Sequence, residues 1–268
     1  MKKKKVIYYK DELNDDFAGN NIEVKSLPKN FKHVHHNPIY KLGEFFVYYV
    51  IAKPIIWVIM KFGYLSKIRN KKVLKSAKKT GYFIYGNHTG NMPDAFQPNL
   101  LHLFKKNYVV VGPAALSITG LRTFISMLGA IPLGTTFDEK IKFLECIRTR
   151  IKKKSSVMIY PEKHIWPYYT DIRPFENESF RFPVSLNVPC FALTTTFHKR
   201  RGPFAISKKP KLITFLDGPF YPDLSLKPSD AKQKLRDDVY NAMKLRATQK
   251  EQYKYIEYIK EEISTETN

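Results

Sequence analysis

The sequence predicts an α/β protein in which a mixed, largely parallel central sheet is flanked by helices. From residue 80 onward, short apolar runs alternate with segments of helical periodicity. The chain has 268 residues, of which 43% are hydrophobic and 14% aromatic, so it can fold and bury one sizeable core. An apolar segment at residues 39–65 precedes this alternation and predicts an N-terminal apolar helical hairpin.

Residues 1–38 are polar and mixed, and we expect them to form a separate N-terminal segment. Residues 6–9 favour a short strand, and the acidic stretch 11–21 is typical of a loop. The HVHH cluster at residues 33–36 is not expected to bind a metal, because no further ligand stands at a useful spacing. The N-terminal MKKKK is not followed by an apolar stretch, so no secretory signal is visible.

Residues 39–75 are expected to form a membrane-associated helical hairpin with a basic flank. The most hydrophobic part could pass for a transmembrane helix, but Glu44 and Lys53 lie inside it and Pro54 interrupts it near its middle. Two short helices joined near Lys53 therefore fit better. An apolar hairpin beside the basic stretch 67–79 is typical of a protein that lies in an anionic membrane interface. The alternative is that the hairpin packs on the protein's own core.

Residues 76–268 are expected to form the catalytic domain. The apolar runs predict strands at residues 82–86, 107–112, 129–133, 156–160, 190–195 and 211–216. Helical periodicity predicts helices at residues 94–105, 117–128, 137–153, 176–186 and 229–246. Ser229 is the expected N-cap of the last helix, and the polar tail after Thr248 is expected to be frayed or weakly helical.

The charge of the chain requires an anionic partner or surface. Lys and Arg number 46 against 24 acidic residues, giving a formal net charge of +22. Nucleic acid, an anionic membrane leaflet and an anionic substrate are the candidates, and a Lys-rich composition can also be a proteome-wide bias. Cys146 and Cys190 stand far apart in apolar settings, which indicates buried thiols and a reducing, cytoplasmic compartment.

The stretch GNHTGNMPDAF, residues 86–96, carries the candidate chemistry. His88 lies in a predicted strand-to-helix turn, and Asp94 lies in the first turn of the following helix. A carboxylate that holds one imidazole nitrogen protonated leaves the other nitrogen free to take a proton from a nucleophile. The alternative for such a pair is a hydrogen-bonded structural contact or an N-cap.

Three further blocks follow in order along the chain. They are Gly120-Leu121-Arg122 with LGAIPLG at residues 128–134, Ile159-Tyr160-Pro161-Glu162 followed by Arg173-Pro174-Phe175 and Phe180-Arg181, and NVPCFAL at residues 187–193. With these blocks, residues 80–220 resemble the PlsC-like family of glycerophospholipid acyltransferases, which includes lysophosphatidic acid acyltransferase. The family pattern is an NH(x)4D block, a glycine-containing block, an FPEG-type block and a VP-type block.

The chain departs from the family pattern at three points. Five residues separate His88 from Asp94 where the family has four, and we expect a small bulge at Gly90 and Asn91 with Pro93 at the first helical position. The third block reads PEKH where the family often has PEG followed by Arg, so Lys163, His164 or Arg173 would supply that charge. The second block ends at Gly134-Thr135, where the family often has an arginine that binds the acceptor phosphate, and Arg122 is the nearest alternative cation.

The resemblance implies transfer of a fatty acyl group from a thioester to a lysophospholipid hydroxyl, by default that of lysophosphatidic acid. His88 would be the general base and Asp94 would orient it. The implied substrate-binding residues are Asn87, Arg122, Glu162 and Arg173, although a structural salt bridge of Glu162 with Arg173 or Lys163 is an equal alternative and Asn87 could instead orient the turn.

The expected partners follow from the same resemblance and from the basic, apolar leader. Acyl-CoA or acyl-carrier protein would be the co-substrate, with no cofactor and no metal. Anionic membrane lipids and the lysophospholipid acceptor are the expected partners, at the cytoplasmic face of a membrane, and no nucleic acid is expected. The competing hypotheses are a basic, non-catalytic binder of nucleic acid or anionic membranes, and an acyltransferase fold that has lost its activity.

Overall fold

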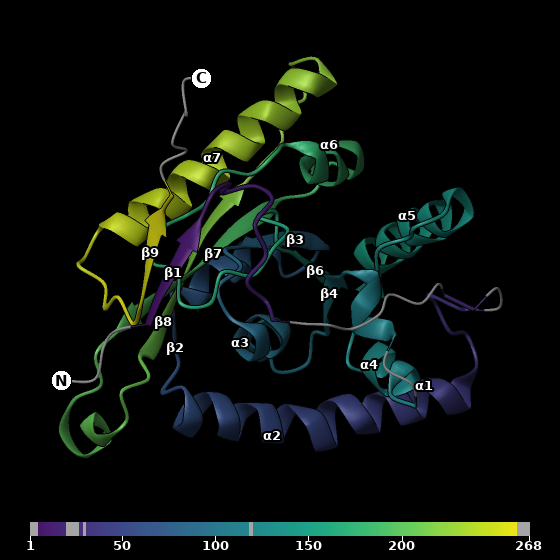
Figure 1. The fold of residues 1–268 in the computed structure, drawn as a ribbon. Helices are drawn as coiled ribbons and strands as arrows, with labels where there is room; N and C mark the ends of the chain where they lie inside the picture. The colour runs from purple at the N-terminus through teal and green to yellow at the C-terminus, as the bar shows by residue number, and fades with distance from the viewer. Residues whose placement is uncertain (1–4, 20–26, 29–30, 118–119, 262–268) are drawn as a thin grey trace, which may run out of the picture.

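A seven-stranded sheet forms the centre of the protein in the computed structural model, which describes residues 5–19, 27–28, 31–117 and 120–261 (Figure 1). The strand order is β2-β8-β7-β3-β6-β4-β5, and neighbouring strands are parallel except for β7 and β8. The strands are β2 (Lys67–Arg69), β3 (Tyr82–Gly86), β4 (Asn107–Val111), β5 (Ala130–Pro132), β6 (Ser156–Ile159), β7 (Cys190–His198) and β8 (Lys211–Phe220). The predicted mixed, largely parallel sheet is confirmed.

Helices cover both faces of this sheet. Side chains alternate between the faces of the central strand β3, in which every residue is buried. Phe83 and Tyr85 pack in the cluster that contains side chains of α5 (Phe137–Lys152), α6 (Arg181–Leu186) and α7 (Pro228–Thr248). Tyr82 and Ile84 pack on the other face with the 3₁₀ helix η3 (Lys71–Ala77). Burial on both faces fixes the carboxyl end of β3, where the candidate site begins.

The predicted hairpin at residues 39–65 is wrong, because residues 38–63 form one continuous apolar helix. Its parts are α1 (Pro38–Phe45), the π-helical η1 (Phe46–Ala52), α2 (Lys53–Val58) and the π-helical η2 (Ile59–Gly63). Pro54 has no amide hydrogen to donate, and its ring crowds the preceding turn of an ordinary α-helix. The wider turn of η1, in which the Lys53 amide bonds to Tyr48 O, accommodates the proline without a break.

This helix, called the long helix below, buries one narrow stripe. Tyr48, Ala52, Ile56 and Met60 are buried at four-residue spacing, and the last three pack in one cluster with Phe197 and Leu212 of the sheet. Only 28% of its most apolar window is buried, so most of its apolar side chains face outward. By length and composition it is the one helix among the described residues that could cross a membrane.

The two ends of the described chain meet in a second, two-stranded sheet. The predicted strand at residues 6–9 is confirmed as β1 (Lys5–Tyr9), and it pairs in parallel with β9 (Ile256–Lys260). The prediction of a frayed or helical tail after Thr248 is therefore wrong for β9. Residues 256–260 are held by this pairing and by Tyr258, whose ring stacks on Trp166 at 5.1 Å. Residues 262–268 of the predicted tail lie outside the described residues.

The remaining helices agree with the sequence in place but are shorter or start elsewhere. Pro98 limits the predicted helix 94–105 to α3 (Asn91–Phe96) and the 3₁₀ turn η4 (Gln97–Leu100). The last helix starts at Pro228 after Lys227, so Ser229 is not its N-cap. Within the predicted helix 117–128, residues 118–119 lie outside the described residues. The other short helices are η5 (Pro113–Leu116), α4 (Arg122–Met127), η6 (Glu178–Phe180) and η7 (Gly202–Ile206).

Candidate active site

His88 and Asp94 form a hydrogen-bonded pair at the carboxyl end of β3. His88 Nδ1 lies 2.9 Å from Asp94 Oδ2, and the same oxygen accepts from the amides of Thr89 and Gly90 at 2.8 and 2.9 Å. The carboxylate favours the tautomer that carries its proton on Nδ1, which leaves Nε2 as an acceptor. The geometry is that of a general base with its orienting carboxylate.

The extra residue between His88 and Asp94 is absorbed at the start of α3. Gly90 is the N-cap in an extended conformation, so the helix begins at Asn91 and Pro93 occupies its third position rather than the expected first. The Asp94 amide bonds to Gly90 O at 3.0 Å, which closes the first turn while the side chain reaches back to the Thr89 and Gly90 amides. The longer spacing therefore leaves the pair intact.

Tyr160 supports the pair from the neighbouring strand. It directly follows β6, which lies beside β3, and its ring stacks on the His88 ring at 4.5 Å and 15°. Its hydroxyl donates to Asp94 O at 2.6 Å. Burial, and secondarily the Asp94 charge, raise the pKa of Tyr160 well above its usual range, so the phenol keeps its proton and remains a donor.

Glu162 and Arg173 form a fully buried ion pair beneath the His88 turn. Glu162 Oε2 accepts from the His88 amide at 3.0 Å and from Arg173 Nη2 at 3.2 Å, and Glu162 Oε1 accepts from the Arg173 amide at 3.1 Å. Both side chains are completely buried. Burial raises the pKa of the Glu162 carboxyl, while Arg173 and the two amides oppose the rise. The predicted alternative, a structural salt bridge between Glu162 and Arg173, is therefore observed. Neither side chain lines the large cavity in front of His88.

The loop after Glu162 also holds the backbone of the turn. The Trp166 amide donates to His88 O at 3.0 Å, and the Tyr168 amide donates to Thr89 O at 2.9 Å. The Arg173 guanidinium lies over the Trp166 ring at 4.8 Å. Together with the bond from the His88 amide to Glu162, these bonds fix the backbone on both sides of the His88 imidazole.

The N-terminal segment packs against this loop, although the sequence predicted only an acidic loop there. Arg173 Nη1 donates to Glu12 O at 3.2 Å, and Trp166 Nε1 donates to Asp15 O at 2.8 Å. His164 Nδ1 lies 3.4 Å from Asp16 Oδ2. Residues 20–21 of the predicted loop lie outside the described residues.

A cavity of about 690 Å³ opens in front of His88. Its floor is largely apolar and comes from the carboxyl ends of β4, β5 and β6 together with Phe143 and Leu144 of α5. Its charged lining residues are Asp16, Asp94, Lys140, Lys163, Glu176, Glu178 and Arg181. An apolar cavity with charged groups at its edge suits a substrate that has an apolar chain and a charged head.

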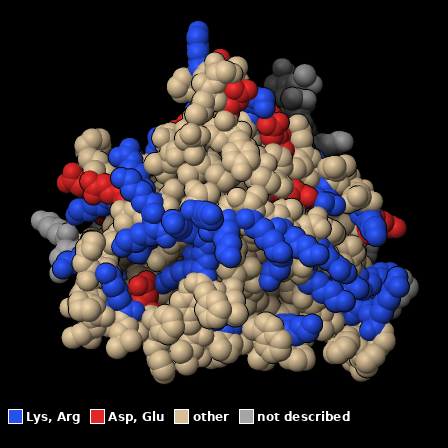
Figure 2. Space-filling model, turned by 180° about the vertical axis from the view of Figure 1, so that it is seen from behind, with Lys and Arg blue, Asp and Glu red and all other residues tan. Residues whose placement is uncertain are grey.

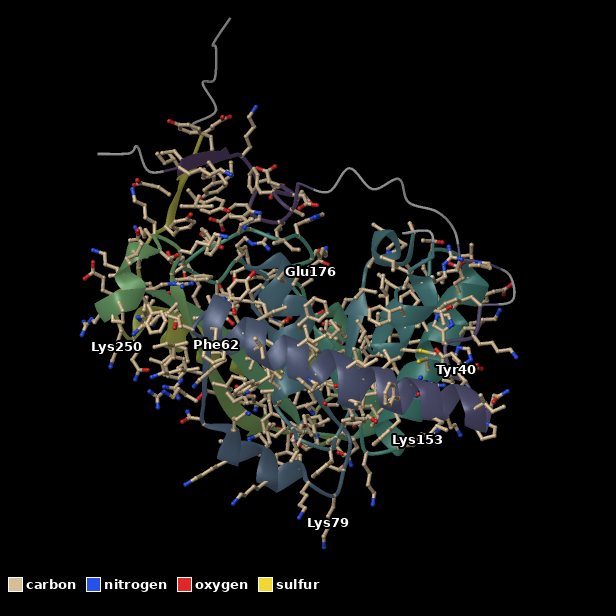
Figure 3. The ribbon with its side chains drawn as sticks, turned by 90° about the horizontal axis from the view of Figure 1, so that it is seen from below. Tyr40, Phe62, Lys79, Lys153, Glu176 and Lys250 are labelled. Atoms are coloured by element: carbon tan, nitrogen blue, oxygen red, sulfur yellow. The ribbon has the colours of Figure 1, made fainter. Side chains whose placement is uncertain are left out.

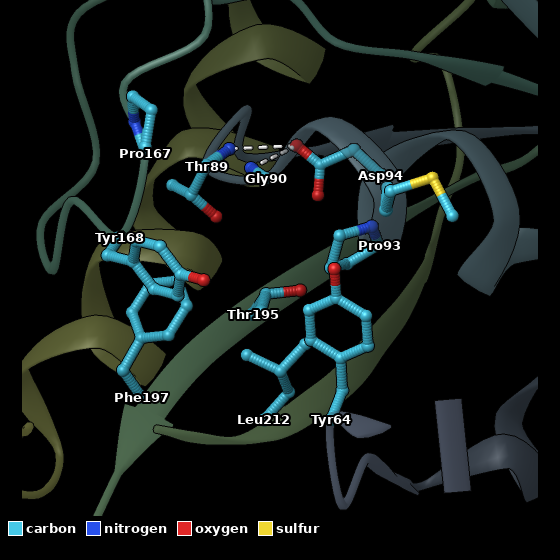
Figure 4. Close-up of a pocket in the computed structure, with 11 residues that line it drawn as sticks. Tyr64, Thr89, Gly90, Pro93, Asp94, Pro167, Tyr168, Thr195, Phe197 and Leu212 are labelled. Atoms are coloured by element: carbon cyan, nitrogen blue, oxygen red, sulfur yellow. Dashed lines mark hydrogen bonds between the residues drawn. The ribbon is translucent and has the colours of Figure 1, made fainter. Parts of the chain in front are cut away.

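A second, smaller pocket of about 170 Å³ shares Asp94 with the larger cavity (Figure 4). Tyr64, Thr89, Tyr168 and Thr195 contribute hydroxyls to its lining. Thr89 Oγ1 is buried and makes no hydrogen bond within the described residues. His88 does not line this pocket, so the chemistry of the imidazole faces the larger cavity.

Two predicted substrate-binding residues have structural contacts instead of a place in the cavity. The Asn87 amide group bonds to the Thr195 carbonyl at 3.0 Å and to the Thr195 amide at 2.8 Å, which ties the turn to β7. Arg122 Nε donates to Leu116 O at 3.0 Å, and Arg122 is not among the described residues that line the cavity. Within the described part of the chain, no three His, Cys, Asp or Glu side chains group as a metal site.

Sequence reasoning assigned no role to Tyr160, Trp166 or the segment around Asp16. For Tyr160 a signal was present, because an aromatic residue at the end of a strand adjacent to β3 must lie near the His88 turn. No comparable signal marks Asp16, because its contact with His164 spans more than 140 positions and depends on tertiary packing.

Comparisons with known proteins place the chain in a structural context. The family model described as Acyltransferase matches residues 66–196. Among solved structures, the chain is similar to the crystal structure of the 1-acyl-sn-glycerophosphate (LPA) acyltransferase, PlsC, from Thermotoga maritima. The TM-score is 0.52 at 14% sequence identity, and the match covers 80% of this chain and 91% of that chain. At this identity the likeness establishes the fold. The comparison with curated proteins found no match.

Proposed function

We propose that this chain, whose residues 66–196 form an acyltransferase-family domain in a PlsC-like fold, transfers a fatty acyl group from a thioester to a lysophospholipid hydroxyl. The observation that carries the proposal is the His88–Asp94 pair at 2.9 Å, placed at the wall of a largely apolar cavity of about 690 Å³. Acyl-CoA or acyl-carrier protein is the donor.

The reaction follows from the position of the imidazole. His88 Nε2 takes the proton of the acceptor hydroxyl while the hydroxyl oxygen attacks the thioester carbonyl carbon. The tetrahedral intermediate then expels the thiolate, which recovers the proton from the imidazolium. Asp94 stabilises the imidazolium, and general-base catalysis of this kind is worth roughly 10²–10⁴-fold.

The oxyanion requires donors other than the amides of the turn itself. Those of Thr89 and Gly90 already bond to Asp94, and that of His88 bonds to Glu162. Lys163, which follows Glu162 and lines the cavity, is the cation we assign to this role. Glu162 and Arg173 act in this account as positioning residues that hold the turn.

The acceptor phosphate needs a cation in the lining of the cavity. An arginine at position 134 cannot replace Gly134 without movement, because an added Cβ would lie 2.4 Å from the Glu139 carbonyl carbon. Lys140 lines the cavity close to Gly134, and we assign the phosphate contact to it. Lysophosphatidic acid is the default acceptor, and another lysophospholipid or a glycolipid is the alternative.

The surface around the long helix supports a location at an anionic membrane. Figure 2 shows a band of Lys and Arg side chains above a largely uncharged lower edge. In the view of Figure 3, Lys79 and Lys153 project toward the rim of the molecule on the same side of the helix. Ile39, Leu42, Phe45 and Phe62 of the helix are each more than half exposed. The helix runs along the edge of the sheet domain, so it would lie in the cytoplasmic interface rather than cross the bilayer (Figure 1).

The experiment that tests this function is an acceptor and donor panel. Purified protein is incubated in anionic liposomes with labelled acyl-CoA or acyl-carrier protein and a series of lysophospholipids, with His88→Ala as the blank. Acyl transfer by the wild type alone supports the proposal and identifies both substrates. No transfer from either donor would favour a fold that has lost its activity.

A further inference from the structure

The tip of the β7–β8 hairpin, residues 199–210, exposes apolar side chains that the active site does not use. Its sequence is KRRGPFAISKKP, and the 3₁₀ helix η7 occupies its centre. Ile206 is 92% exposed and Phe204 is 50% exposed. A short connection between two strands does not require large, exposed apolar side chains, so Phe204 and Ile206 call for an explanation.

The apolar pair is surrounded by positive charge. Lys199, Arg201, Lys208 and Lys209 are exposed on its two sides, and residues 199–210 contain no acidic residue. An exposed apolar pair between basic side chains matches a surface with negative charge outside and hydrocarbon beneath, which is the profile of an anionic lipid leaflet.

The tip is fixed to the end of the long helix. Arg200 Nη2 donates to Gly63 O at 2.5 Å, and Arg200 Nε donates to Lys209 O at 2.8 Å. The Leu212 amide donates to Tyr64 O at 3.2 Å. Figure 1 shows the tip at the lower edge of the molecule, at the level of the long helix, while α7 lies on the opposite side.

We infer that residues 199–210 are a second contact with an anionic bilayer, which inserts Phe204 and Ile206 beside the C-terminal end of the long helix. The inference rests on the membrane location in the proposed function. Two contacts fixed to each other define the orientation of the sheet domain on the membrane, whereas a single helix could rotate about its axis.

The binding test uses charge and apolar variants with matched controls. Partitioning onto phosphatidylcholine vesicles with and without phosphatidylglycerol is measured by flotation for the full chain. Lys208→Gln with Lys209→Gln should weaken binding to the anionic vesicles by roughly 25-fold, about fivefold for each lysine. Phe204→Ser with Ile206→Ser should weaken it by about tenfold or more. Leu224→Ser and Lys227→Gln, on the connection between β8 and α7, should leave binding unchanged.

A labelled variant tests the insertion itself. Cys146 and Cys190 are buried, so an environment-sensitive fluorophore on Ile206→Cys reports on the tip alone. Its emission should shift to the blue with anionic vesicles, and the same label on Leu224→Cys should not shift. Wild-type affinity for anionic vesicles in both tip variants would overturn the inference, and so would an unshifted emission of the label at position 206. Binding to duplex DNA that depends on the tip, without binding to vesicles, would also overturn it.

The failure of this inference is distinguishable from failure of the proposed function. Acyl transfer to a lysophospholipid in detergent micelles does not require vesicle binding, so the tip variants should keep wild-type kcat in that assay. If the wild type transfers no acyl group in micelles, the proposed reaction is contradicted. If the tip variants bind vesicles as the wild type does, only the proposed membrane contact of the tip is contradicted.

Discussion

Removal of Arg173 should destabilise the protein in a way that depends on pH. Arg173→Met leaves the Glu162 carboxylate buried without its cation, and such a loss costs about 3–5 kcal/mol. At about 2–4 °C per kcal/mol for a chain of this size, the melting midpoint should fall by roughly 6–20 °C at pH 7.

The sign of the pH dependence follows from the pKa of Glu162, which burial already raises and which the loss of Arg173 raises further. The folded variant then holds a proton more tightly than the unfolded chain. Its stability relative to wild type is therefore highest at acidic pH and decreases as the pH rises above about 4.3, the ordinary pKa of glutamate. The deficit should be smaller at pH 5 than at pH 7.

Thermal unfolding followed by circular dichroism at the two pH values measures this deficit directly. A loss below about 1 kcal/mol at pH 7, or a deficit that does not change with pH, would refute the reasoning about the buried pair.

A double variant separates positioning from stability. Glu162→Leu with Arg173→Met removes both charges and should recover much of the lost stability. It should not recover acyl transfer, because the His88 amide has lost its acceptor. Recovery of both properties would show that the pair does not position the turn.

The remaining predictions concern the histidine pair and one buried imidazole. Asp94→Asn should lower kcat by about 10²–10⁴-fold with a small change in KM, because the asparagine amide disfavours the Nδ1–H tautomer of His88. Steady-state kinetics of acyl transfer measure this effect, and an unchanged kcat would contradict it. Tyr160→Phe keeps the ring that stacks on His88 but removes the hydroxyl that donates to Asp94 O. The free energy of unfolding should therefore fall by about 1–3 kcal/mol. Calorimetry that shows no fall in this free energy would argue against the bond. Burial, together with nearby lysines, lowers the pKa of His102 in the folded protein to about 4. Wild-type stability should therefore decrease as the pH falls from about 6.5 to 4, because His102 takes up a proton in the unfolded chain first. His102→Gln should flatten this part of the curve of stability against pH, and a curve identical to that of the wild type would exclude the contribution.

The central sheet was predictable because its strands are short, apolar and separated by clear helical segments. Residues 82–86 read as a buried strand, and β3 has these bounds. The long helix was mispredicted because Pro54 is a reliable helix breaker only in an ordinary α-helix. A π-helical turn has no sequence signature that marks it in advance, so a local rule could not find it.

The site was predictable where chemistry and local sequence coincide. His88 and Asp94 are six positions apart and lie in one turn, so their pairing follows from the strand-to-helix turn that the sequence predicts. Arg122 was chosen as the nearest cation in sequence, but its guanidinium bonds to Leu116 O instead. The pairing of β1 with β9 joins residues some 250 positions apart, and no local signal could indicate it.

The proposed reaction depends most on His88 as the base. The direct measurement is kcat for acyl transfer by wild type and His88→Ala under saturating donor and acceptor, with melting midpoints recorded for both proteins. We predict a loss of at least roughly 10²-fold with an unchanged midpoint. Transfer by His88→Ala at a rate close to that of the wild type would contradict the assignment of the base.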